Sequence, residues 1–318
     1  MRILFAASPA IAVPALEAVL ETDDVDVAGV LTNPDTPRGR NGLAAPTDVG
    51  AAAAGFVRKS AETGGKNFPV LKPLILDSAV RRQIAPLKAD LLVSFAYGKI
   101  FGSKFLSLFP AGGINIHPSL LPKYRGPTPV QAAILNREKN TGITIQKLAR
   151  EMDSGDILAQ ETVRLTGRET TAVLSELMAK KAAFMLPAVI REIAAGKITG
   201  TVQNHNDATY CHLTKREDGL IDWNKSAVQI DARIRAFDPW PLSWTIHNNR
   251  ELFILEAEAL ACEKSGKAGL VLGTDNGILL QTGEGILAVR KLQYQTKKAL
   301  VWSDFLNGAR DFIGSKLG

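Results

Sequence analysis

The chain of 318 residues contains 46% apolar and 22% charged side chains. This length favours two domains, because single hydrophobic cores stop growing at about 250–300 residues. The composition is that of a folded globular protein and excludes a mainly disordered or low-complexity chain. The two cysteines, Cys211 and Cys262, form no CxxC pair, which excludes a disulfide framework or a zinc ribbon and favours a reducing cytoplasm.

The N-terminal residues Met1–Ala7 begin like a signal peptide, but Pro9, Pro14 and Glu17 interrupt the apolar run. We therefore expect a first strand here and no export signal. Apolar runs such as Leu91–Ala96 are much shorter than the about 20 residues that a membrane span needs. The sequence predicts no membrane partner.

The formal net charge is +6. The positive surplus lies in residues 1–206, whereas residues 207–318 carry as many acidic as basic side chains. A mild excess of this kind is compatible with a polyanionic partner and equally with a solvated basic surface.

Strand and helix patterns alternate along the first half of the chain. Short apolar or β-branched runs predict strands at Arg2–Ala7, Val25–Thr32, Phe68–Leu71, Asp90–Ala96 and Gly113–His117. Helical spacing predicts helices at Val13–Leu20, Thr47–Thr63 and Ser78–Leu87, and the proline- and glycine-containing segment Asn33–Pro46 predicts a long loop. This alternation is typical of an α/β fold with a Rossmann-like, doubly wound, mostly parallel sheet, whose site lies at the carboxyl ends of the strands.

Two common nucleotide sites are excluded by their missing glycines. The first strand is followed by Ala6-Ala7-Ser8-Pro9, which is no GxGxxG fingerprint for a dinucleotide. The chain also contains no GxxxxGK[ST] phosphate loop.

The second half begins with predicted helices at Pro127–Leu135 and Thr171–Ala195, and a linker follows at residues 196–206. Beyond the linker the pattern changes to short strands separated by turns. We expect a helix at Ser226–Phe237, strands at Trp244–His247, Leu252–Ala257, Gly269–Gly273, Ile278–Gln281 and Ile286–Leu292, and a last helix at Trp302–Phe312. Five short strands predict a small OB-like β-barrel domain at residues 207–318.

The segment from Asn115 to Pro122 holds the densest group of chemistry-bearing residues. Asn115 and His117 are two residues apart on a predicted strand, so they face the same side of the sheet, and Pro118 ends the strand. A lone histidine here would read as a hydrogen-bonded core residue, but the Asn–x–His pair, the strand end and the proline-framed loop favour a functional role for His117. Asp153, in Met152-Asp153-Ser154-Gly155-Asp156, alone reads as an Asx turn between two strands. Only the fold decides whether its carboxylate reaches His117.

These segments resemble a known family. Asn115–Gly126, Thr141–Ile145 and Met152–Ile157 resemble the catalytic domain of the folate-dependent formyltransferases. Asp218–Trp223 and Ile234–Pro241, together with the stretch at Leu292–Ala299, are similar to the second domain of those members that formylate methionyl-tRNA. The resemblance runs nearly end to end.

The resemblance implies transfer of a formyl group from 10-formyltetrahydrofolate to the α-amine of methionyl initiator tRNA. It assigns catalysis to Asn115, His117 and Asp153. It assigns binding of the folate to Ser119, Leu120, Leu121, Pro122, Phe95, Ala96, Tyr97 and Gly98. It also implies a catalytic domain at residues 1–195, a tRNA-binding domain at residues 207–318, no metal, and a cytoplasmic monomer.

Four basic residues are implied to bind the tRNA. Arg38 and Arg40 lie on the Asn33–Pro46 loop, and the resemblance transfers best to Arg40. Lys297 and Lys298 lie near the C-terminus. Each pair also reads as an ordinary solvated cluster.

The implied roles suit the chemistry. A free α-amine titrates near about 8, so much of it is unprotonated at neutral pH. Asn115 can donate to an oxyanion, and His117 can also move protons, while Asp153 orients the imidazole or a relaying water. The alternatives are a formyltransferase acting on an amino-sugar nucleotide or another small amine, a 10-formyltetrahydrofolate hydrolase, and an RNA-binding protein with a vestigial site.

Overall fold

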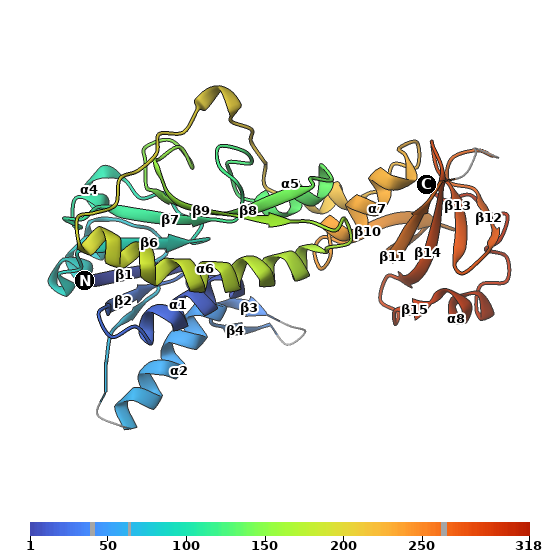
Figure 1. Cartoon of the computed structure of the whole chain (residues 1–318). Coiled ribbons are helices and arrows are strands. Elements are labelled where there is room, and N and C mark those ends of the chain that lie inside the picture. The colour runs from blue at the N-terminus through green and yellow to red at the C-terminus, as the bar shows by residue number, and fades with distance from the viewer. Residues whose placement is uncertain (39–41, 63–64, 262–265) are drawn as a thin grey trace. The chain divides into compact units, whose positions relative to one another are not determined.

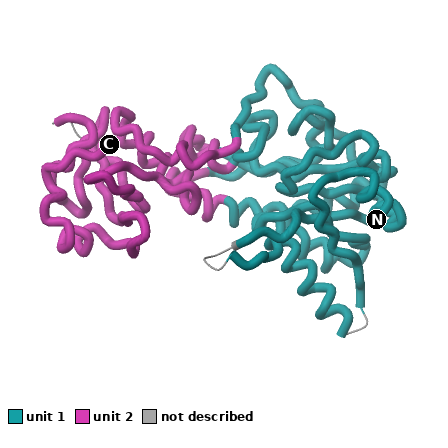
Figure 2. The backbone as a smooth tube through the Cα atoms, turned by 180° about the vertical axis from the view of Figure 1, so that it is seen from behind, with its two compact units in different colours: residues 1–129, 140–164, 175–212 teal, residues 130–139, 165–174, 213–318 magenta. Residues whose placement is uncertain are grey.

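A computed structural model describes residues 1–38, 42–62, 65–261 and 266–318 (Figure 1). Arg40 and Cys262 therefore lie outside the described residues. The chain divides into two compact units (Figure 2). The first contains residues 1–129, 140–164 and 175–212, and the second contains 130–139, 165–174 and 213–318.

The first unit is built on a seven-stranded sheet with the order β5-β2-β1-β6-β7-β8-β9. Its strands are β1 (Arg2–Ala7), β2 (Asp26–Leu31), β5 (Val70–Leu71), β6 (Leu91–Phe95), β7 (Gly113–His117), β8 (Asn140–Lys147) and β9 (Ile157–Arg164). The five strands from β5 to β7 pair in parallel, while β7–β8 and β8–β9 pair antiparallel. The predicted mostly parallel α/β sheet is confirmed.

The helices of the first half follow the predicted alternation. They are α1 (Val13–Leu20), α2 (Asp48–Glu62), α3 (Ser78–Ile84) and α4 (Ser103–Leu106), with 3₁₀ turns at Ala10–Ala12 and Ala85–Leu87. α2 begins after Thr47, whose hydroxyl accepts the amide of Gly50 at 3.0 Å and so satisfies one of the free donors of the first turn.

The long helix α6 (Thr171–Ala194) runs along the sheet (Figure 1). Its side chains at every fourth position are buried, namely Leu174, Met178, Ala182, Leu186 and Ile190. This spacing places them on one face, which is the amphipathic pattern of a helix that packs on a core.

The predicted loop at Asn33–Pro46 contains regular structure. Two short strands, β3 (Thr36–Arg38) and β4 (Leu43–Ala45), pair antiparallel in it. Sequence patterns miss such a hairpin because three-residue strands carry no measurable period. Arg38 therefore lies at the end of a strand.

The antiparallel strands β8 and β9 bring the two halves of the chemical motif together. β8 pairs with β7 so that Asn115 lies opposite Gln146 and His117 opposite Thr144. The chain then turns through Asp153, with φ at 52°, and returns as β9. Gly155 is required in this turn, because a Cβ there would lie 1.9 Å from the carbonyl oxygen of Lys147.

The second unit contains an antiparallel β-sheet, as the sequence predicts. Its strands are β10 (Ser243–His247), β11 (Arg250–Leu260), β12 (Val271–Thr274), β13 (Ile278–Gln281), β14 (Ile286–Tyr294) and β15 (Leu300–Val301). They follow the order β10-β11-β14-β13-β12, and β15 pairs with β14. Buried side chains of α7 (Ala227–Ala236), including Ile230 and Ile234, join the apolar core of this unit.

Helices near the ends of the units differ slightly from the prediction. α5 covers Pro129–Leu135, and short 3₁₀ turns cover His205–Asp207 and Arg216–Gly219. α8 covers only Trp302–Asn307, whereas the sequence predicts a helix to Phe312. The helix ends where Gly308, a poor helix former, becomes its C-cap.

Candidate active site

The site begins with two side chains on β7. Asn115 and His117 alternate with the buried Ile114 and Ile116, so the two polar side chains share one face of the strand. His117 is 4% exposed. Its Nε2 lies 2.8 Å from the carbonyl oxygen of Tyr124. Because a carbonyl oxygen can only accept, Nε2 carries a proton and donates it.

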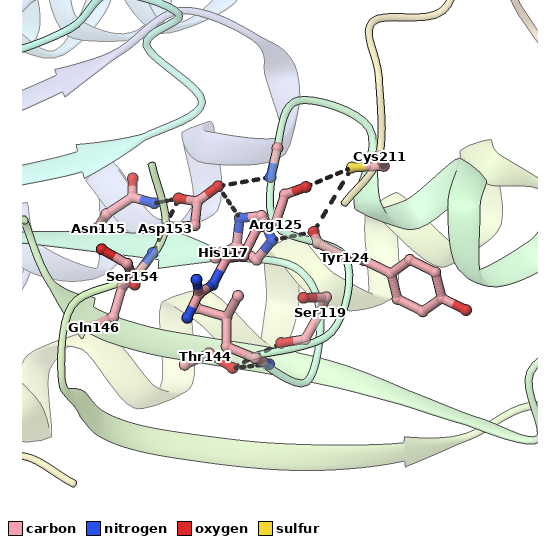
Figure 3. A network of polar contacts seen from close by, with 12 residues as sticks. Asn115, His117, Ser119, Tyr124, Arg125, Thr144, Gln146, Asp153, Ser154 and Cys211 are labelled. Atoms are coloured by element: carbon pink, nitrogen blue, oxygen red, sulfur yellow. Dashed lines mark hydrogen bonds and ion pairs between the residues drawn. The ribbon is translucent and has the colours of Figure 1, made fainter. Parts of the chain in front are cut away.

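Asp153 connects the two side chains (Figure 3). Its Oδ1 accepts from Asn115 Nδ2 at 3.3 Å and from Gln146 Nε2 at 3.0 Å. Its Oδ2 accepts from the backbone amide of Gly126 at 2.8 Å and lies 3.6 Å from His117 Nδ1. Asp153, 38 residues after Asn115 in the chain, therefore forms one cluster with Asn115 and His117.

The arrangement leaves two chemical functions free. An amide NH₂ has two protons, so Asn115 can give one to Asp153 and the other to a second acceptor. The His117 imidazole has its Nε2 proton engaged by Tyr124, so any proton that it exchanges is held at Nδ1, facing the carboxylate of Asp153. The cluster can bind a developing negative charge and move a proton beside it.

The segment Ser119–Pro122 follows directly and is tied to the sheet by Thr144. The Thr144 hydroxyl donates to the Ser119 carbonyl at 2.7 Å and accepts the Leu121 amide at 3.3 Å. Gln160 Nε2 donates to the Leu121 carbonyl at 3.0 Å and to Thr144 Oγ1 at 2.8 Å. Thr144 is completely buried. The loop is thus held by its backbone; Ser119 and Leu121 are buried, and Leu120 and Pro122 are partly exposed.

The segment Phe95–Gly98 ends β6 and turns outward. Ala96 has φ at 51° and is exposed, whereas Phe95 and Tyr97 are buried. The Tyr97 carbonyl accepts from Asn33 Nδ2 at 3.0 Å. Burial raises the pKa of the Tyr97 phenol to about 12. Tyr97 therefore packs into the core as a neutral side chain, whereas Ala96 and Gly98 are exposed.

The candidate tRNA-binding residues are divided between the two units. Arg38 ends β3, and Arg40 lies outside the described residues. Lys297 and Lys298 are exposed on the turn between β14 and β15. Each unit thus carries part of this set.

Three buried side chains around the site are missed by the sequence reasoning. Gln146 touches Asp153 directly, and Arg125 and Gln203 lie behind it. Their signals are weak, because a glutamine inside a strand or a linker carries no motif. The β7–β8 register, which places Gln146 opposite Asn115, is what assigns it to the site.

Two further features of the described residues concern membrane spans and metal sites. In residues 1–38, 42–62, 65–261 and 266–318, no helix is long and apolar enough to cross a membrane. No group of three or more His, Cys, Asp or Glu side chains in the same part of the chain could hold a metal ion.

Comparison with known families assigns the class. Residues 1–190 match the family "Formyl transferase", and residues 214–310 match "Formyl transferase, C-terminal domain". The chain is therefore a member of the formyl transferase family. The first match covers the α/β sheet with Asn115, His117 and Asp153, and the second covers the antiparallel β-sheet.

Relatives narrow the assignment. A methionyl-tRNA formyltransferase of Treponema denticola is 48% identical over 320 residues, which cover 98% of this chain and 98% of that protein. One of Borrelia duttonii is 39% identical, over 99% of both chains. At this identity and coverage, the chain belongs to the methionyl-tRNA formyltransferase group of the family.

Solved structures share the fold. The N-formyltransferase of Helicobacter canadensis, in complex with folinic acid and dTDP-3-aminofucose, aligns with a TM-score of 0.64 at 19% identity, covering 90% of this chain and 98% of that one. HypX of Aquifex aeolicus in complex with tetrahydrofolic acid aligns with a TM-score of 0.59 at 16% identity, covering 98% of this chain and 48% of that one.

Proposed function

We propose that the chain transfers the formyl group of 10-formyltetrahydrofolate to the α-amine of methionyl initiator tRNA. The observation that carries this proposal is the contact of Asp153 with both Asn115 and His117 at the carboxyl end of β7. The group membership and the β7 cluster support the same reaction. In it, a C–N bond forms between the α-amine and the formyl carbon, and the bond from that carbon to N10 of the folate breaks.

Asn115 is proposed to stabilise the oxygen of the formyl group as negative charge develops on it. One proton of its amide is given to Asp153 Oδ1, which fixes the direction of the other. Donors fixed in advance lower the barrier because they need no rearrangement during the reaction. Losing one such donor typically costs about 3 kcal/mol of barrier.

His117 and Asp153 are proposed to handle the proton that the amine releases and N10 gains. The amine must lose one proton as it attacks, and N10 must gain one as it leaves. His117 exchanges this proton at Nδ1, because Nε2 is held by Tyr124. Asp153 faces Nδ1 from 3.6 Å, so its negative charge favours the proton there and orients the ring.

The folate is proposed to lie against Ser119, Leu120, Leu121 and Pro122 and against the backbone of Phe95, Ala96, Tyr97 and Gly98. Two features support this fit. The first loop is anchored through its backbone by Thr144 and Gln160, and its Leu120 and Pro122 are partly exposed. In the second, Ala96 and Gly98 are exposed, and the backbone turns at Ala96, where φ is 51°. Backbone amides and carbonyls presented in this way suit a flat ring edged with donors and acceptors.

The tRNA is proposed to contact both parts of the chain through Arg38, Arg40, Lys297 and Lys298. We assign catalysis to residues 1–195, linkage to 196–206 and a tRNA platform to 207–318. Phosphate contacts spread over two parts of the chain fix the register of a ligand much larger than the catalytic cleft. We also propose that the chain acts as a monomer in the cytoplasm, without a metal.

An acceptor panel tests the proposal. The protein is incubated with 10-formyltetrahydrofolate and methionyl initiator tRNA, methionyl elongator tRNA, an amino-sugar nucleotide, or no acceptor. We expect rapid formylation of the initiator tRNA, with much slower reaction in the other three mixtures. Preference for the amino-sugar nucleotide, or equal release of formate without an acceptor, would overturn the proposal.

A further inference from the structure

Gln203 lies in the segment that the sequence predicts to be a linker, yet it is only 3% exposed. Its amide nitrogen donates to the carbonyl oxygen of Asp153 at 2.9 Å and to that of Gly155 at 2.7 Å. A longer contact of 3.2 Å reaches Gln146 Oε1. One side chain therefore holds both ends of the tight turn that carries Asp153.

Gln146 transmits this arrangement to the carboxylate. Its Nε2 donates to Asp153 Oδ1 at 3.0 Å, while its Oε1 faces the amide nitrogen of Gln203. A flipped Gln146 would turn its oxygen toward the carboxylate and its nitrogen toward a donor. The contact with Gln203 thus favours the one orientation in which Gln146 supports a charged Asp153.

Arg125 fixes the opposite end of Gln203. Its guanidinium donates to Gln203 Oε1 from Nη2 at 2.7 Å and from Nε at 3.2 Å. Arg125 is 1% exposed, and its guanidinium also lies 3.3 Å from the Tyr210 hydroxyl and 3.3 Å from His205 Nδ1. A buried guanidinium holds a carbonyl oxygen strongly and repels an amide nitrogen. Gln203 must therefore point its nitrogen toward the Asp153 turn.

We propose that Gln203 is a positioning residue for Asp153, with Arg125 setting the direction of its amide. This inference rests on the proposed role of Asp153 in formyl transfer. The chain from Arg125 through Gln203 and Gln146 keeps the Asp153 carboxylate between Asn115 and His117. The stretch between the two family domains thus completes the active site and does more than connect them.

The substitution Gln203→Glu tests the two ends of the side chain independently, because it changes only the end that carries the nitrogen. A carboxylate keeps both bonds from Arg125, so the guanidinium remains paired. It places an acceptor where the nitrogen stood, against the carbonyl oxygens of Asp153 and Gly155 and against Gln146 Oε1. The turn then loses its donor while the space is filled by a side chain of the same shape.

We expect Gln203→Glu to lower kcat at least about tenfold, with KM for both substrates within about threefold, because a displaced Asp153 acts on the reaction and not on binding. The acid limb of the kcat–pH profile should move to higher pH, because the negative charge introduced beside the Asp153 turn favours the protonated form of carboxyl groups near it. A merely structural defect would lower the profile without moving it.

The matched control is Gln281→Glu in the second unit. Gln281 is also fully buried and donates its amide to two backbone carbonyls, those of Thr282 and Gly285. The change should destabilise the protein through the same chemistry but leave the acid limb of the kcat–pH profile in place. Gln203→Met supplies a second variant, which removes the donor without adding a charge.

The deciding experiment is a double-mutant cycle between Gln203→Glu and Asp153→Asn. If Gln203 acts through Asp153, adding Gln203→Glu to the Asp153→Asn variant should alter kcat less than about twofold. The same tenfold loss on both backgrounds, or single variants within twofold of wild-type kcat and with an unmoved acid limb, would overturn the inference. Full activity of Asp153→Asn alone would instead refute the proposed role of Asp153.

Discussion

The Nε2 atom of His117 donates to the backbone carbonyl of Tyr124 at 2.8 Å, so the histidine that we propose to be catalytic is fixed by the loop that follows it in the chain. The imidazole cannot exchange protons on both of its nitrogens without breaking this bond. Its Nδ1 edge lies beside Asp153 and is the edge that we propose to exchange the proton. The loop of residues 118–126 therefore orients the proposed base as well as contributing the proposed folate contacts.

His117→Ala should lower kcat by about two orders of magnitude or more, while the affinity for the folate changes little. The imidazole acts on proton transfer in the transition state and is absent from the proposed folate contacts. Steady-state kinetics with saturating folate measure this. His212→Ala, at an exposed position, is the control and should retain wild-type activity. A His117 variant that keeps more than about a tenth of wild-type turnover is incompatible with a contribution of about 3 kcal/mol.

Asp153→Asn should preserve the size of the side chain and lose about 10²–10³ in kcat. An amide must present NH₂ either to the donating nitrogens of Asn115 and Gln146 or to the amide of Gly126, and each choice puts two donors face to face. The dependence of kcat on pH should change in form as well as in height. A profile that is lowered uniformly at every pH would argue that Asp153 only supports the fold.

Thr144→Val should weaken folate binding more than it lowers kcat. Valine fills the same space but cannot hold the Ser119 carbonyl or the Leu121 amide, so the loop loses its anchor. We expect a loss of about 1–3 kcal/mol in stability for leaving buried polar groups unpaired. Thr245→Val removes the acceptor of the Trp223 indole at 3.0 Å in the second unit. This control should destabilise the protein while leaving the folate KM unchanged, and an equal rise in both variants would contradict the anchoring role.

Lys297 and Lys298 are exposed, so replacing both by alanine should not unfold the protein. If both contact phosphate, the plot of log affinity against log salt concentration should become shallower by about two units. Binding of initiator tRNA at several salt concentrations measures this. Arg40→Ala should act in the same direction and spare folate affinity. Unchanged slopes would identify these residues as ordinary solvated side chains.

The stability of the second unit should fall with acid because of His247. Burial is the main cause and lowers the pKa of this histidine. Of two smaller effects, the charge of Asp311 raises the pKa and that of Arg250 lowers it. Below the reference value of about 6.5 the unfolded chain binds a proton that the folded chain does not, so stability decreases as pH falls from there and is constant above it. His247→Gln should flatten this dependence.

All four tryptophans, at positions 223, 240, 244 and 302, lie in the second unit, so intrinsic fluorescence reports its unfolding. Denaturant unfolding followed in this way between about pH 5 and 8 measures the effect. An identical pH dependence in wild type and His247→Gln would show that His247 does not contribute.

Local pattern predicts where the site residues lie in the elements, whereas their roles are implied only by the resemblance to the family. Asn115 and His117 share a face through the period of two of a strand, and Pro118 marks the strand end. Asp153 could be read as a turn residue from its neighbours Ser154 and Gly155. Whether its carboxylate reaches the histidine depends on the antiparallel return of β8, which no local pattern encodes.

The supporting side chains could not be predicted from the sequence. Gln203 and Gln146 are 57 residues apart in the chain and meet only because the segment after α6 returns to the sheet, where Thr201 pairs with Ile157. The polar composition of residues 196–206 predicts a solvated linker. A single buried glutamine in such a segment gives no periodic signal.

The central claim is the destination of the formyl carbon, and isotope labelling tests it most directly. The protein is given 10-formyltetrahydrofolate labelled at the formyl carbon together with methionyl initiator tRNA, and the amino acid released from the tRNA is analysed by mass spectrometry. We predict labelled N-formylmethionine in a one-to-one ratio with the tetrahydrofolate formed, and loss of the product in the His117→Ala variant. Label recovered as formate, with unmodified methionine on the tRNA, would contradict the claim.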